Sequence, residues 1–171
     1  MMRLSLTGKN VVAVALAGLI LLLSGAAQAQ YRDEPAGRVG GGSVIRIFEG
    51  NRFDRCSGVF LDGNDNMLRI AFNTRREYAL SIPQVVVPRG QRLEIAVGAA
   101  GIGSDSADAV GNQNGRAWRM LDQRAVDLMM RFRGPIIVAT NSTRFTWNLG
   151  DSVENVLVAI ENCTNRAMGW R

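Results

Sequence analysis

FTWNLGDSVENVLVAIENC, residues 145–163, contains the periods of both a strand and a helix. Apolar side chains at positions 145, 147 and 149 alternate with polar ones, which is the period of a strand with one buried face. Beyond Gly150 the apolar positions recur every three or four residues as far as Cys163, and Asp151 with Glu154 has the composition of a helix N-terminus. The stretch predicts a strand followed at once by an amphipathic helix over 151–165, with Cys163 facing the core.

The same two periods run through the rest of the chain. Short, turn-bounded runs rich in β-branched and aromatic residues predict strands, and a helical apolar stripe starts after Asp122 and stops at Gly134. The predicted fold class is α+β, a mainly antiparallel curved sheet or sandwich of about seven or eight short strands with two amphipathic helices. The strands are expected near 44–48, 53–61, 67–74, 77–82, 93–97, 136–140 and 144–149, and the helices near 122–133 and 151–165.

Residues 1–29 have the three parts of a secretory signal peptide. Arg3 and Lys9 precede an apolar run over 11–23, and Ala27-Gln28-Ala29 is a small-x-small cleavage site. The alternative is an uncleaved membrane anchor, because the apolar segment is near the short limit of what spans a bilayer. The cleavage site favours removal, which predicts a periplasmic or secreted protein that meets the membrane only through its signal peptide during export.

The chain beyond the signal peptide is expected to form a short leader and one domain. The stretch over 30–42, QYRDEPAGRVGGG, is polar and rich in glycine, which is typical of a flexible segment. The remaining chain has the length of one domain with a core of its own. We therefore expect a single disulfide-stapled globular domain over 43–171.

Histidine is absent from the whole chain, and the only lysine, Lys9, lies in the signal peptide. A Ser-His-Asp or Cys-His arrangement cannot be built without an imidazole, and a lysine base is missing as well. Histidine zinc ligands are excluded, and two cysteines alone cannot complete a zinc site. The sequence therefore predicts no catalytic residues, no metal site and no cofactor.

Cys56 and Cys163 are the two cysteines of the chain. In an oxidising compartment two cysteines of a small domain most often pair. The bridge would close a loop of about 108 residues and contribute roughly 4 to 5 kcal/mol on the chain-entropy model. Intermolecular disulfides or free thiols are the alternatives, and the intramolecular bond is the prediction we favour.

The acidic residues after Cys56 suggest two kinds of site. DGNDN, residues 62–66, starts like a calcium loop, but Met67 and Asn73 stand where such a loop needs glycine and glutamate, so a hairpin turn is predicted. Carboxylate pairs such as Asp105 with Asp108 would be needed by the alternative function, a carboxylate-dependent hydrolase acting on envelope polymers.

The preferred function is a noncatalytic binding or envelope-associated module. Removal of Arg3 and Lys9 with the signal peptide lowers the formal net charge from +5 to +3, and the arginines are dispersed, so nucleic acid is not an expected partner. The stretch over 98–115 is rich in Gly, Ser, Asp and Asn, which is typical of a long binding loop. A protein, peptide or glycan ligand is expected there, at Ser104, Asp105, Asp108, Asn112, Asn114 and Arg116.

The chain also resembles a known group of proteins. Its cysteine before a first hairpin, central amphipathic helix and FTWNLGDSVENVLVAIENC ending resemble a family of small uncharacterised periplasmic proteins of alphaproteobacteria. It is similar more distantly to invasion-associated locus B proteins, whose extra cysteines are absent here. The resemblance covers roughly 44–165 and rests on Cys56, Gly150, Ser152 and Cys163. It implies an exported noncatalytic domain and supplies no catalytic residues.

Overall fold

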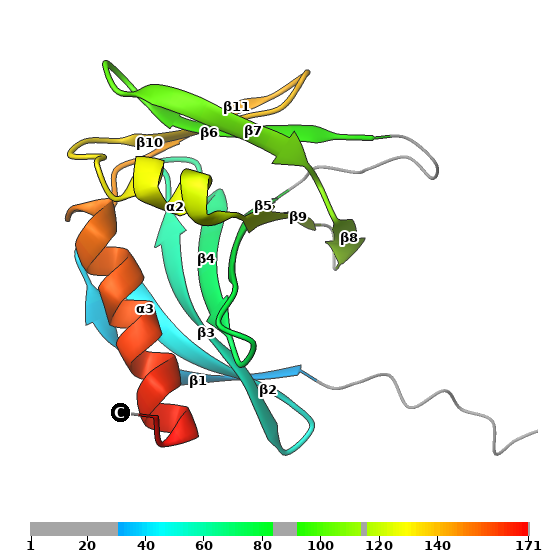
Figure 1. Ribbon diagram of the computed structural model, residues 1–171, viewed down its shortest axis with the longest axis vertical. Helices are drawn as coiled ribbons and strands as arrows, with labels where there is room; N and C mark the ends of the chain where they lie inside the picture. Colours follow the sequence, from blue (N-terminus) through cyan, green and yellow to red (C-terminus); the bar gives the residue numbers. More distant parts are fainter. Residues whose placement is uncertain (1–30, 84–91, 114–115, 171) are drawn as a thin grey trace, which may run out of the picture. The chain divides into compact units, whose positions relative to one another are not determined.

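The computed structural model describes residues 31–83, 92–113 and 116–170, and the predicted signal peptide lies outside them. This part of the chain forms a seven-stranded and a four-stranded antiparallel sheet with two helices (Figure 1), so the α+β prediction is confirmed with more strands than expected. The strands are β1 (Tyr31–Val39), β2 (Gly42–Glu49), β3 (Arg52–Leu61), β4 (Met67–Asn73), β5 (Tyr78–Pro83), β6 (Glu94–Ala99), β7 (Gly103–Asp108), β8 (Gly111–Gln113), β9 (Arg116–Leu121), β10 (Ile136–Ala139) and β11 (Arg144–Trp147), and the helices are α2 (Gln123–Met129) and α3 (Val153–Met168).

The long sheet has the strand order β1-β2-β3-β4-β5-β9-β8, in which β1 to β5 form a meander and β9 and β8 join after the chain has passed through β6 and β7 of the short sheet. The predicted hairpin turn over 62–66 connects β3 to β4. The Asp62 carboxylate accepts the backbone N–H groups of Asn64 at 2.8 Å and Asn66 at 2.9 Å, and Asp65 adopts a positive φ of 59°. The side chain of Asn66 also donates to this carboxylate, which is the main reason that the pKa of Asp62 lies below its ordinary value. These polar atoms hold the turn itself.

The predicted flexible leader over 30–42 is wrong for its described residues. β1 pairs with β2 along its whole length, with a bulge between Pro35 and Gly37. β1 is an edge strand, and most of its side chains are exposed. Because neither face of β1 is buried, its sequence lacks the alternation of apolar and polar residues that predicts a strand. The glycines after it form a tight turn, in which Gly40 has a φ of 52°. The folded unit therefore starts at β1.

The predicted long loop over 98–115 is also corrected. The described part of it contains two strands, β7, which pairs with β6, and β8, which pairs with β9. β9 itself was not expected, because Met120 and Leu121 fit the apolar stripe of the helix that follows them. Asp122 is the N-cap of that helix, as predicted, and accepts the backbone N–H of Ala125 at 2.8 Å.

The short sheet has the strand order β11-β10-β6-β7, and α2 packs against β7 and β9 (Figure 1). Trp147 on β11 is fully buried, which confirms its predicted place in the core. Its indole N–H donates to the backbone oxygen of Asn66 at 2.8 Å, at the turn between β3 and β4. This bond ties the short sheet to the long one.

α3 lies in the curve of the long sheet and packs against β1, β2, β3 and β4 (Figure 1). Its predicted apolar stripe is confirmed, since Val153, Val156, Leu157, Ile160 and Cys163 are buried. The N-cap is Ser152, whose hydroxyl accepts the N–H of Asn155, and not Asp151 as the sequence suggested.

The start of α3 is held by the turn between β1 and β2, because Gly41 donates its N–H to the Leu149 oxygen at 2.8 Å. None of the helices in the described ranges has the length and apolar composition that crossing a membrane requires.

Candidate functional site

Those residues of the predicted binding loop that the structure describes are distributed over three strands, β7, β8 and β9. Ser104 and Asp108 are exposed on β7, and the Asp108 carboxylate lies 3.6 Å from the Arg92 guanidinium. Asn112 belongs to β8, and Asn114 lies outside the described residues.

Asp105, the third of them on β7, points inward and forms an ion pair with Arg119 of β9. Arg119 is 1% exposed, and its guanidinium also donates to the backbone oxygens of Asp105 at 2.8 Å and Ile95 at 3.1 Å. A buried guanidinium needs such partners, because an unpaired charge in the protein interior is strongly unfavourable. Asp105 therefore has a structural task, which is to bind the two sheets together.

Arg116 on β9 is also occupied by the protein itself. Its guanidinium donates to the hydroxyl and the backbone oxygen of Ser81, both at 3.1 Å, and to the backbone oxygen of Met67. Burial, and secondarily the nearby Arg69, lower the pKa of Arg116 to about 10. The side chain stays charged at neutral pH and fastens β9 to β4 and β5.

Two adjoining hollows between the C-terminal half of α3 and the strands β1 and β2 form a better candidate site. Their volumes are about 330 and 430 Å³, and they share Ala36, Cys163 and Arg166 as lining residues. We call them together the β1–α3 groove. It is lined by Ala36, Gly37, Arg38, Val44, Arg46, Ala159, Asn162, Cys163, Asn165, Arg166, Ala167 and Trp170.

The predicted disulfide between Cys56 of β3 and Cys163 of α3 is confirmed, and it fixes one wall of the groove. The neighbouring Thr164 adds a second link, because its buried hydroxyl accepts the Cys56 N–H at 3.3 Å and donates to the Phe72 oxygen at 2.9 Å. Tyr78 of β5 adds a third, donating its hydroxyl to the Glu161 carboxylate at 3.0 Å. The helix therefore cannot slide along the sheet, and the groove is preformed.

Burial, followed by the nearby Glu161 carboxylate, raises the pKa of the Tyr78 hydroxyl above its ordinary value. Tyr78 therefore remains protonated at neutral pH and keeps its bond to α3.

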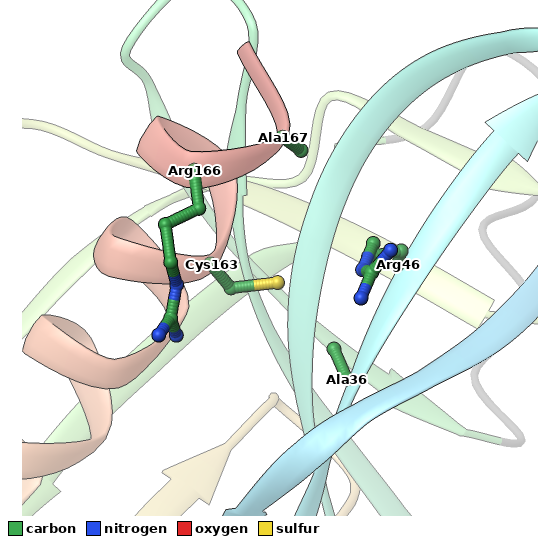
Figure 2. A pocket seen from close by; sticks show the side chains of 5 residues that line it. All are labelled: Ala36, Arg46, Cys163, Arg166 and Ala167. Atoms are coloured by element: carbon green, nitrogen blue, oxygen red, sulfur yellow. The ribbon is translucent and has the colours of Figure 1, made fainter. Parts of the chain in front are cut away.

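Three exposed arginines from three different elements line the groove: Arg38 of β1, Arg46 of β2 and Arg166 of α3. Figure 2 shows two of them, Arg46 and Arg166. Figure 2 shows the Cys163 sulfur between Arg166 on one side and Arg46 on the other. Within the described residues, none of the three guanidinium groups has a carboxylate within 4.0 Å, although eight other arginines do.

The acidic residue opposite Arg46 in the β1–β2 ladder is Glu34, and it forms an ion pair with a different arginine. Glu34 pairs with Arg46 in the register of β1 and β2, but its carboxylate lies 3.1 Å from the guanidinium of Arg32. Arg166 donates only to the backbone oxygen of Asn162, at 3.2 Å, one turn earlier in α3. The groove therefore has a positive charge that the described residues leave without a counter-ion.

Trp170 is half-buried at one end of the groove, beyond the αL cap of α3 at Gly169. Its ring lies under the Arg76 guanidinium, which is 4.8 Å from the ring centroid. This cation–π contact holds the tryptophan against the turn between β4 and β5. The groove thus offers guanidinium and side-chain amide groups around a small apolar floor of Ala36, Val44 and Ala159.

The groups that line the groove are suited to binding an anion. Guanidinium groups bind carboxylates, phosphates and sulfates by charge-assisted hydrogen bonds. The cysteine here is disulfide-bonded, so it offers no thiolate nucleophile. In the described part of the chain, no three Asp, Glu, His or Cys side chains are placed to hold a metal ion.

The groove was not found from the sequence. Arg46 and Arg166 are 120 positions apart, and only the docking of α3 on the sheet brings them together. The disulfide was the available signal, because it places Arg166 one helical turn from a residue bonded to β3. Comparisons of this chain with protein-family models, with curated proteins and with solved structures give no match. The family resemblance stays a prediction.

Proposed function

We propose that the protein is an exported, noncatalytic binding module of the periplasm or the extracellular space, which holds an anionic ligand in the β1–α3 groove. The observation that carries the proposal is the set Arg38, Arg46 and Arg166, which lines the two adjoining hollows of the preformed groove and has no carboxylate partner among the described residues. The disulfide is consistent with an extracytoplasmic location, because such bonds persist in oxidising compartments.

The absence of catalysis is part of this proposal. Several carboxylates that a hydrolase would use have structural tasks: Asp62 holds a turn, Asp105 neutralises Arg119, and Asp122 caps α2. No contact among the described residues gives a specific reason to prefer the hydrolase. We expect the mature chain, residues 30–171 without the predicted signal peptide, to release no soluble fragments from purified peptidoglycan. Such release would favour the hydrolase.

The binding proposal is tested by isothermal titration of the mature, oxidised protein. Three anionic probes represent the chemistry of envelope ligands: inorganic phosphate, trigalacturonic acid and an acetylated peptide of glutamates. Because a hydrogen bond to a charged group contributes about 1.5 to 3 kcal/mol, each Arg→Gln change in the groove should weaken binding of the preferred probe by about tenfold or more. The variants are Arg38→Gln, Arg46→Gln and Arg166→Gln.

The matched controls remove the same charge elsewhere. Arg52 at the start of β3 and Arg144 on β11 are both exposed and do not line the groove. Arg52→Gln and Arg144→Gln should leave the affinity unchanged within about twofold, since long-range attraction is screened by salt. Equal losses in the control and groove variants, or no binding of any of the three probes, would refute the assignment of the groove.

A further inference from the structure

β7 is one of the two edge strands of the short sheet, and β11 is the other. β7 pairs with β6 on one side, and no strand of the described chain pairs with its other side. Five of its six residues are exposed. An open edge presents backbone N–H and C=O groups that can pair with an added strand.

The ladder shows which backbone groups of β7 face outward. One step beyond the ladder, Ala109 donates its N–H to the Leu93 oxygen at 2.7 Å, so these two residues form a hydrogen-bonded pair. Hydrogen-bonded and non-hydrogen-bonded pairs alternate in an antiparallel ladder. Val97 and Asp105 lie four positions from Leu93 and Ala109 in the same register, so they also form a hydrogen-bonded pair. The N–H and C=O groups of Asp105 therefore point to β6, and those of Ser104 and Ser106 point away from the sheet.

The edge strand β1 of the other sheet has two features that hinder the pairing of an added strand, a proline and a bulge, and β7 has neither. β1 carries Pro35, which has no N–H, followed by a bulge that interrupts its ladder. β7 contains no proline, and its register with β6 runs without a shift from Gly103 to Asp108. A regular edge without proline or a bulge can pair with an added strand, which is a common mode of peptide binding.

A cleft of about 530 Å³ lies between the beginning of β7, with the turn before it, and the exposed face of α2. We call it the β7–α2 cleft, and it is lined by Ile102, Gly103, Ser104, Gln123, Arg124, Asp127, Leu128 and Arg131. On the other side of the sheet, a hollow of about 340 Å³ lies over the small residues around Gly98 and Ala96 and reaches Ser104. The side chains on one face of an added strand would therefore find space in the β7–α2 cleft.

The charge of the cleft indicates the chemistry of the occupant. Arg131 has no carboxylate within 4.0 Å among the described residues, and Arg124 is 85% exposed with its guanidinium 3.7 Å from Asp105. Asp127, the acid that lines the cleft, already accepts a hydrogen bond from Gln123 at 2.7 Å. Leu128 adds a half-buried apolar surface between the two arginines.

We propose that β7 binds an extended acidic peptide as an additional antiparallel or parallel strand, with alternate side chains of the peptide in the β7–α2 cleft. Backbone pairing with Ser104 and Ser106 supplies the affinity, and Arg124 with Arg131 selects acidic side chains. This surface is separate from the β1–α3 groove and shares no lining residue with it. The inference therefore does not depend on the proposed function.

The test pans a phage-displayed library of random eight-residue peptides against the mature, oxidised protein. We expect enriched peptides with acidic residues at alternate positions. Ser106→Pro removes an outward N–H while edge positions tolerate proline, so the affinity of enriched peptides should fall by about tenfold or more. Ser106→Ala is the matched control, because it removes the same hydroxyl, which bonds Glu94, and keeps the N–H.

Peptides with every second amide N-methylated give an independent readout on the wild-type protein. One phase of methylation should abolish binding and the other should not, because only alternate amides face β7. No enrichment, enrichment without acidic residues, or equal sensitivity to both methylation phases would overturn the proposal. Dimerisation that Ser106→Pro abolishes would assign the edge to a second copy of the chain and overturn it as well. Arg166→Gln should leave peptide binding unchanged, and a matching loss there would also count against it.

Discussion

Replacing Gly40 by alanine should destabilise the protein far more than replacing Gly50. Both glycines follow a strand of the β1–β2–β3 meander, and both have a positive φ, 52° at Gly40 and 61° at Gly50. A Cβ at Gly40 would overlap the backbone oxygen of Leu149, whereas a Cβ at Gly50 would meet no atom within 4 Å. The pair of variants separates the cost of the close approach from the cost of the backbone conformation.

The expected magnitudes follow from these contacts. Alanine in the left-handed region costs about 1 to 2 kcal/mol, part of which is offset because alanine also restricts the unfolded chain. For Gly50→Ala we therefore expect a loss of about 1 kcal/mol. At Gly40 the obstacle is a backbone atom, so the turn must move and lose the bond from Gly41 to Leu149, which adds about 1 to 3 kcal/mol.

The assay is urea denaturation of the mature, oxidised protein, followed by the fluorescence of its buried tryptophan and by far-ultraviolet circular dichroism. The free energy of unfolding should fall by about 2 to 4 kcal/mol for Gly40→Ala and by about 1 kcal/mol for Gly50→Ala, with unchanged slopes. If the two values agree within about 0.5 kcal/mol, the packing of this turn against the start of α3 contributes nothing, and the reasoning fails.

Three further predictions concern the links within the domain. Replacing both Cys56 and Cys163 by alanine should lower the free energy of unfolding by about 5 kcal/mol, because the disulfide spans a sequence separation of 107 residues. A loss below about 2 kcal/mol in urea denaturation would contradict this. Asp105→Asn should lower the free energy of unfolding by about 3 kcal/mol, because the buried Arg119 loses its counter-ion. Unchanged stability would contradict the structural role of Asp105 and favour the ligand-binding role expected from the sequence. Tyr78 has a raised pKa in the folded state, so its protonated hydroxyl contributes fully to the free energy of unfolding below the ordinary pKa of 10.0. This contribution is lost as the pH rises above that value. Tyr78→Phe should remove that part of the fall in unfolding free energy between about pH 9 and 11, and an unchanged profile would refute the partly buried hydrogen bond from Tyr78 to Glu161 of α3.

The elements predicted correctly from the sequence share one property, which is that one of their faces is buried. The apolar stripe of α3 and the alternation of β4 record that burial directly, so their positions were predicted closely. The disulfide followed from the number of cysteines and the expected compartment, and the structure contains it. The turn at Asp62 was recognisable because asparagine and aspartate tolerate the backbone conformation that it needs.

The candidate site was accessible to sequence reasoning only in part. The stretch over 98–115 drew attention by its polarity, and its β7 lines the β7–α2 cleft, but as a strand rather than a loop. Asp105 looked like a ligand-binding residue, since nothing in the sequence shows that its partner is Arg119 on another strand. The arginines of the β1–α3 groove resemble all the other dispersed arginines until the positions of their possible carboxylate partners are known.

By itself the sequence determined the α+β class, the two helices and the disulfide between Cys56 and Cys163. Because the sequence has no histidine, it also excluded imidazole chemistry. The tertiary structure alone decided that β1 and β7 are strands and which charged groups are paired. The reason is physical: side-chain periodicity records burial, whereas an exposed edge strand is held by backbone hydrogen bonds that almost any residue can make. The pairing of charges depends on distances across the fold, which no local pattern records.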